Sequence, residues 1–161
     1  DIFTGISLSK SFTKDYSTVI IKHANPCGVA LDKRKINSYL KAYECDATSA
    51  FGGIISCNYK VDKIVAKEIS KKFFEVVVAN GFESSALNIL KRKKNLRLID
   101  SSSLREINFE QNTSIMNNFL SQSSDTKMFK RDDFKIVSKV KPSNDTPALA
   151  KANNGIMPKA T

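Results

Sequence analysis

Short apolar runs alternate with segments of helical periodicity along the first hundred residues, and this alternation limits the possible folds most strongly. Residues 17–21 are a short continuous apolar run typical of a strand buried on both faces. Three further strands are predicted at 51–56, where two glycines precede the apolar residues, at 75–79 and at 96–99. Strands that alternate with helices of about 10 to 15 residues indicate parallel crossover units with right-handed connections. The sequence therefore predicts an α/β fold, a layered sheet with alternating strands and helices.

Three segments between these runs are predicted helices. The apolar residues at helical spacing in the first two are Ile36, Tyr39, Leu40 and Tyr43, and Val61, Val65, Ile69 and Phe73. We expect Asp32 to cap the first helix, and Asp62 lies near the start of the second, which spans about 61–74. Residues 83–94 form the third predicted helix.

The rest of the chain carries weaker signals. The length of 161 residues favours one domain. Residues 1–16 are treated as a lead-in, and 100–133 are rich in Ser, Asn and Gln without clear periodicity. Residues 134–140 alternate like a strand, whereas 141–161 hold three of the four prolines and predict a loop or a disordered tail.

Composition restricts the class of protein but not its partner. The formal charge of +10 suits nucleic acid, acidic lipid or a phosphorylated small molecule, and the densest basic run, 91–95, suits a solvated helix end. No apolar run approaches the roughly 20 residues that span a bilayer, so we expect a cytoplasmic protein. The three cysteines, an odd number at irregular spacing, predict free thiols at Cys27, Cys45 and Cys57.

The single histidine follows the first predicted strand, next to a lysine. Neutral imidazole accepts a proton near pH 7 and an adjacent ammonium stabilises negative charge, so Lys22 and His23 supply both halves of acid–base chemistry. We expect them at the carboxyl end of their strand, where ligands bind in open α/β sheets. A hydrogen-bonded structural histidine is the alternative. Pro26 and Gly28 predict a tight turn here.

Two other kinds of site were weighed. Zinc is not predicted, because the chain has no C-x-x-C pair and Asn25 stands where the H-x-E motif of zinc deaminases needs glutamate. A Walker-type phosphate loop is excluded because Gly52 and Gly53 lack its spacing and its lysine. Their backbone amides could still face a ligand, or the glycines could simply permit tight packing.

Three segments taken together are much more specific. "KHANPCGVA", "AYECDATSAFGGIIS" and "FFEVVVANGFESSALNILKRKKNLRLI" closely resemble, in this order, the transformylase region of the bifunctional purine biosynthesis proteins. The resemblance covers about residues 17–99, and a weaker match reaches "FKIVSKVKPS". It implies that 17–140 form the first half of a transformylase domain similar in fold to cytidine deaminases, with 1–16 as lead-in and 141–161 unmatched.

The resemblance also implies a reaction and a set of site residues. The family transfers a formyl group from 10-formyltetrahydrofolate, its co-substrate, to the amine of aminoimidazole carboxamide ribotide (AICAR), giving FAICAR on the route to inosine monophosphate. It implies a cytoplasmic homodimer without nucleic-acid, membrane or metal partners. The implied residues are Lys22 and His23 for catalysis, Asn25, Gly52 and Glu75 for substrate binding, and Pro26, Gly28 and Gly53 for shaping the loops.

Departures from the family pattern leave other functions open. Ala47 replaces the proline that usually precedes the T-S-A-F-G-G run, so this loop is expected to be less rigid. The cyclohydrolase domain and the second transformylase half are not matched, so we expect a fragment that carries part of the site and is inactive alone. The alternatives are a non-enzymatic α/β fragment that binds nucleotide or nucleic acid, and an inactive truncation.

Overall fold

The computed structural model describes residues 1–104, 111–116, 118–122, 135, 137 and 139. The chain divides into two units, Asp1–Ile107 and Asn108–Thr161. The first unit holds a five-stranded sheet of order β2-β1-β3-β4-β5. Its strands are β1 (Tyr16–Lys22), β2 (Asn25–Asp32), β3 (Ile54–Cys57), β4 (Val76–Ala79) and β5 (Arg97–Asp100).

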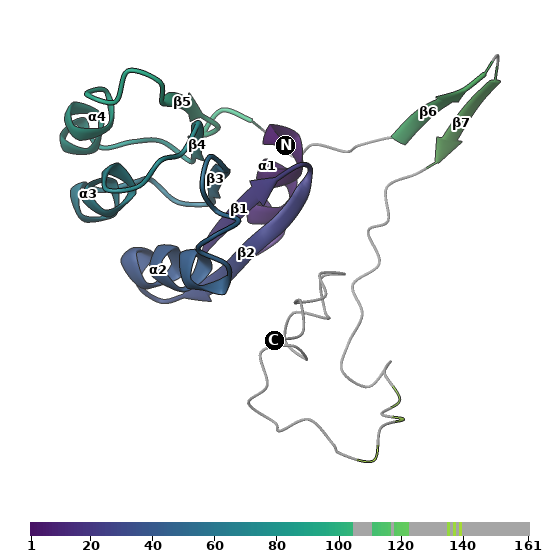
Figure 1. Cartoon of the computed structure of the whole chain (residues 1–161), viewed down its shortest axis with the longest axis horizontal. Helices are drawn as coiled ribbons and strands as arrows, with labels where there is room; N and C mark the ends of the chain where they lie inside the picture. Colours follow the sequence, from purple (N-terminus) through teal and green to yellow (C-terminus); the bar gives the residue numbers. More distant parts are fainter. Residues whose placement is uncertain (105–110, 117, 123–134, 136, 138, 140–161) are drawn as a thin grey trace. The chain divides into compact units, whose positions relative to one another are not determined.

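Helices cover both faces of this sheet, which confirms the predicted layered α/β class (Figure 1). They are α1 (Ile2–Lys10), α2 (Lys35–Cys45), α3 (Lys63–Ser70) and α4 (Ser84–Leu90). Side chains alternate between the faces of the strands: Ile55 and Val77 pack in the core beneath α2, α3 and α4, whereas Ile54 and Val76 pack with Ile6 of α1. Helix α1 falls in the predicted lead-in and was not predicted.

The two helix starts show one correct and one wrong prediction. Asp62 caps α3, because its Oδ1 accepts the N–H groups of Ile64 and Val65 at 2.9 Å each. Asp32 does not cap α2, whose N-cap is Arg34. Instead the Asp32 carboxylate accepts the Arg34 N–H and pairs with the Lys41 ammonium at 2.7 Å, and Lys41 holds the pKa of Asp32 below its ordinary value.

The first predicted crossover is wrong. Strand β1 turns directly into β2 as an antiparallel hairpin, and β1 is also antiparallel to β3. Only β3, β4 and β5 are parallel to one another. Pro26 and Gly28 are turn-forming residues, so a turn was predicted where β2 in fact begins. Pro26 is tolerated in β2 for two reasons: β2 is the outermost strand of the sheet, and a β-bulge lies beside Pro26. At this bulge the register shifts and Cys27 is the extra residue.

The second unit contains an antiparallel hairpin of β6 (Gln111–Ile115) and β7 (Asn118–Gln122). Its polar sequence gave no strand signal. The strand predicted at 134–140 falls mostly outside the described residues, and the tail at 141–161 lies wholly outside them. Within the described part of the chain, no helix has the length and apolar character needed to cross a bilayer.

Candidate active site

The residues predicted for catalysis and substrate binding gather at one edge of the sheet, which we call the amino edge because β3 and β4 begin there. Strand β1 runs the opposite way, so its carboxyl end, Lys22, lies at the same edge. The register Ile21–Ile54–Val76 aligns the ends of the three strands. Consequently the residues just before β3 and β4 lie next to the residues just after β1.

Lys22 joins the hairpin to the loop before β3. Its half-buried side chain reaches across the amino edge, and its Nζ donates to the carbonyl oxygen of Phe51 at 2.5 Å. An ammonium group has three N–H donors, so this bond fixes the position of the charge without using its full hydrogen-bonding capacity. The K-H motif and the A-F-G-G motif, far apart in sequence, are therefore connected by a direct bond.

Gly52 connects the same loop to the segment before β4. Its backbone has φ 69°, a left-handed conformation that favours glycine, and its N–H donates to the Phe73 carbonyl at 3.0 Å. A Cβ built on Gly52 would lie 4.0 Å from Oε1 of Glu75. The Glu75 side chain is exposed, and its backbone N–H donates to the carbonyl of Gly53 at 3.1 Å. Lys22, Gly52 and Glu75 thus form one cluster.

Gly53 is buried between two strands. A Cβ there would lie 3.1 Å from the carbonyl oxygens of both Ala50 and Ile21, so a larger residue would push the loop away from β1. This close approach supports the packing alternative for Gly53, and it keeps Gly52 at the amino edge.

His23 occupies the two-residue turn of the β1–β2 hairpin. His23 and Ala24 have φ values of 52° and 59°, as a type I′ turn requires of both central residues. The His23 side chain is exposed beside Lys22. Asn25, the first residue of β2, folds back so that its Nδ2 donates to the carbonyl of His23 at 2.9 Å. The visible contact of Asn25 is therefore with the turn itself.

Pro26 and Gly28 lie within β2 rather than in a turn, which corrects their predicted place. A Cβ at Gly28 would lie only 2.0 Å from the backbone oxygen of Ala42, so this glycine allows α2 to pack against β2. Cys27 is half-buried, and its Sγ donates to the carbonyl of Ile20 at 3.5 Å. Burial raises the pKa of the Cys27 thiol, so it is protonated at neutral pH and is a poor nucleophile.

An exposed aromatic pair at the amino edge was missed by the sequence analysis. The rings of Phe51 and Phe73 are 5.1 Å apart between centroids and remain 64% and 41% exposed. Phe73 was assigned to the buried face of a helix, but α3 ends at Ser70 and the following Phe74 is the buried one. The adjacent pair Phe73–Phe74 could have indicated an exposed ring, because successive side chains of an extended segment point to opposite sides and only one of the two can face the core.

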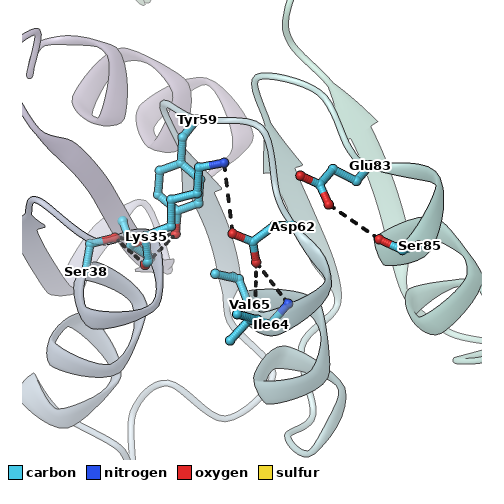
Figure 2. Close-up of polar contacts among 9 residues, drawn as sticks. Lys35, Ser38, Tyr59, Asp62, Ile64, Val65, Glu83 and Ser85 are labelled. Atoms are coloured by element: carbon cyan, nitrogen blue, oxygen red, sulfur yellow. Dashed lines mark hydrogen bonds and ion pairs between the residues drawn. The ribbon is translucent and has the colours of Figure 1, made fainter.

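Polar residues at the opposite edge of the sheet are engaged in structural bonds (Figure 2). The Tyr59 hydroxyl contacts Thr18 Oγ1 at 2.8 Å and donates to the carbonyl of Lys35, and burial raises the pKa of Tyr59 well above its ordinary value. The Lys35 ammonium lies 4.0 Å from the carboxylate of Asp62, which also caps α3. These contacts fix α2 and α3 to the sheet.

The amino edge brings together an ammonium, an imidazole, a carboxylate and two aromatic rings. Such a set can bind a polar, planar molecule, accept a proton from it and stabilise negative charge that develops on it. Among the described residues, no group of three or more His, Cys, Asp or Glu side chains is arranged to hold a metal ion. The fold and the site thus define an α/β protein with acid–base groups at a hairpin turn.

The chain belongs to the AICARFT/IMPCHase bienzyme family, whose pattern it matches over residues 1–154. It is 44% identical over 127 residues to the bifunctional purine biosynthesis protein PurH of Clostridium kluyveri, covering 79% of this chain and 25% of that protein. The PurH protein of Staphylococcus carnosus is 36% identical over 140 residues, which cover 87% of this chain and 28% of that protein. The PurH protein of Prochlorococcus marinus is 39% identical over 142 residues, which cover 87% of this chain and 27% of that protein.

The chain therefore spans about a quarter of the length of the curated relatives that it matches. The family membership confirms the resemblance drawn from the three sequence segments. The similarity to cytidine deaminases stays a prediction.

Proposed function

We propose that this chain carries part of the site at which a formyl group passes from 10-formyltetrahydrofolate to the amine of AICAR, giving FAICAR. Its family membership supports the reaction. The hydrogen bond from Lys22 to the carbonyl of Phe51 is the observation that carries the site assignment, because it unites the two motifs that the resemblance marks as functional. Glu75 adjoins the same loop.

In this proposal the AICAR amine attacks the formyl carbon and forms the new C–N bond. The carbonyl oxygen becomes negatively charged, and the ammonium of Lys22 stabilises that charge. His23 accepts the proton that the amine loses. As the bond between the formyl carbon and N10 of the folate breaks, N10 takes up a proton, so the reaction neither gains nor loses protons overall.

The remaining residues hold the substrate. Gly52 has no side chain, which leaves its position open to a ligand, and the exposed Glu75 carboxylate accepts hydrogen bonds from N–H or O–H groups of AICAR. Asn25 lies two residues beyond His23 and presents its amide near the same turn. Phe51 and Phe73 offer apolar ring surface beside these polar groups.

We further propose that the complete enzyme is a cytoplasmic homodimer that binds AICAR and formyl-folate and neither nucleic acid nor membrane. The family resemblance supports the homodimer and the two substrates. Two observations argue against a nucleic-acid function. The basic run at 91–95 lacks the interleaved aromatic residues that stack on bases, and the predicted site residues lie elsewhere in the sequence.

Binding to the 161-residue chain tests the proposal. Isothermal titration with AICAR should show binding that weakens about tenfold or more in Glu75→Ala, because charge-assisted hydrogen bonds from AICAR to this carboxylate are lost. Glu83→Ala removes a glutamate that follows β4 at the opposite edge and should leave the affinity unchanged.

Two results would contradict the proposal. Salt-sensitive binding of single-stranded RNA without AICAR binding would favour a nucleic-acid-binding fragment. A chain that binds neither molecule and unfolds without cooperativity would favour an inactive truncation.

A further inference from the structure

Asp1 is the N-cap residue of α1 by position, yet its side chain makes no capping bond to its own helix. An N-cap aspartate ordinarily accepts the N–H of the second or third helical residue. Here Oδ1 of Asp1 instead accepts the backbone N–H of Ala24, at 2.5 Å. The carboxylate thus binds the hairpin turn that carries His23.

Helix α1 is firmly attached to the sheet, which fixes the position of this carboxylate. Ile6 is 3% exposed and packs with Ile54, Val76 and Val78. A Cβ at Gly5 would lie 3.1 Å from Cβ of Ser56, and Ser9 Oγ lies 2.9 Å from Ser56 Oγ, so the helix backbone approaches β3 closely. The first residue of α1 therefore stays at the amino edge.

The turn that Asp1 contacts is conformationally unfavourable for its sequence. Type I′ turns favour Asn-Gly, whereas here His23 and Ala24 both adopt the left-handed region that side chains with a Cβ disfavour. Such conformations persist where surrounding contacts over-determine them. One contact comes from Asn25 to the His23 carbonyl, and the other from Asp1 to the Ala24 amide.

We propose that Asp1 is a positioning residue for His23: by holding the Ala24 amide it keeps the turn left-handed and the imidazole directed at the site beside Lys22. The inference rests on the proposed function only for what His23 does once it is positioned. The bond between Asp1 and Ala24 belongs to the fold, so the two parts can be tested separately.

Hydrogen exchange of the Ala24 amide, followed by NMR on the 161-residue chain, tests the structural part. Asp1→Ala should speed this exchange about tenfold or more, because the amide loses a charged acceptor. Asp1→Asn keeps an acceptor oxygen, so its Ala24 amide should exchange at nearly the same rate as in the unsubstituted chain. Glu83→Ala is the matched control, since Glu83 is another acidic N-cap residue without a capping bond and lies at the opposite edge (Figure 2).

Kinetics of the complete enzyme containing this segment test the functional part. Asp1→Ala should lower kcat about tenfold, since misplaced catalytic groups lose rate, with little change in KM. Asp1→Asn should retain most of the rate. Ala24→Gly, added to Asp1→Ala, should recover much of the loss, because glycine adopts the left-handed turn without help from the carboxylate.

Unchanged Ala24 exchange in Asp1→Ala would overturn the inference, as would faster exchange with kcat unaffected while His23→Ala remains defective. If His23→Ala were itself fully active, the proposed function would fail instead, and the exchange data would still decide whether Asp1 holds the turn.

Discussion

Among the glycines that the structure describes, Gly28 is the one whose replacement by alanine should destabilise the protein most. A Cβ at Gly28 would lie 2.0 Å from the carbonyl oxygen of Ala42 and 3.0 Å from its carbonyl carbon. Optimal contact between such atoms is about 3.5 Å, so α2 would have to move by more than an ångström. Both atoms belong to the helix backbone, so no side-chain rotation relieves the clash.

The size of the effect follows from what α2 carries. Tyr39 and Ala42 are 2% and 1% exposed and pack in the main core, so moving the helix loosens their contacts. Overpacking of a core costs about 1 to 3 kcal/mol, and a backbone clash belongs at the upper end, about 3 kcal/mol. In a unit of this size that loss lowers Tm by about 12 °C or more.

Urea unfolding of the 161-residue chain, followed by circular dichroism, measures this cost. Gly52→Ala is the control: its Cβ would be in ordinary contact with two side chains, the Phe73 ring at 3.4 Å and the Glu75 carboxylate at 4.0 Å, so the cost is the left-handed backbone, about 1 to 2 kcal/mol. Gly28→Ala should therefore unfold at clearly lower urea than Gly52→Ala. Equal midpoints, or a milder effect at Gly28, would refute the close packing of α2 on β2.

Three further predictions concern the cysteines. In native protein at neutral pH, iodoacetamide should modify exposed Cys45 first and buried Cys57 last, as mass spectrometry would show; equal rates would contradict the burial. Burial raises the pKa of Cys57 from 9.0 to about 11, so the unfolded chain ionises first and stability should fall as pH rises through this interval. Urea unfolding at pH 8 and pH 10.5 measures this loss of stability, which should be smaller in Cys57→Ala. An equal loss in both proteins would contradict the raised pKa of Cys57. In the complete enzyme, Cys27→Ala should keep most of its kcat, because the Cys27 thiol is protonated and bonded to Ile20; a loss of about a thousandfold together with a trapped formyl adduct would indicate covalent catalysis instead.

The parallel part of the sheet was predictable because each of its elements follows local rules. Strands β3 and β4 are short, almost wholly apolar runs, β5 has the apolar pair Leu98 and Ile99 at its centre, and α3 follows Asp62, an ordinary N-cap residue. The β1–β2 hairpin was not predictable in the same way. Its turn uses His23 and Ala24 in left-handed conformations that sequence does not favour, and β2 holds a proline and a glycine that normally indicate a turn.

The residues of the candidate site likewise divide into those that the sequence indicated and one that depends on a long-range contact. The sequence identified Lys22 and His23 as a pair because they are adjacent, and the resemblance added Gly52 and Glu75, which the structure places at the same edge of the sheet as Lys22. The contribution of Asp1 depends on α1 packing across the face of the sheet and on a side chain that leaves its own helix uncapped. Nothing in the local sequence marks such a long-range contact.

Steady-state kinetics of the complete enzyme from pH 6 to 9 test the central claim that the hairpin turn carries the acid–base groups. His23→Ala and Lys22→Met should each lower kcat by roughly a hundredfold to ten thousandfold. His23→Ala should also remove one titration from the pH profile, whereas Lys22→Met should keep that titration, because the proton acceptor remains and only the charge is gone. Near-normal kcat in both variants would contradict the role assigned to this turn.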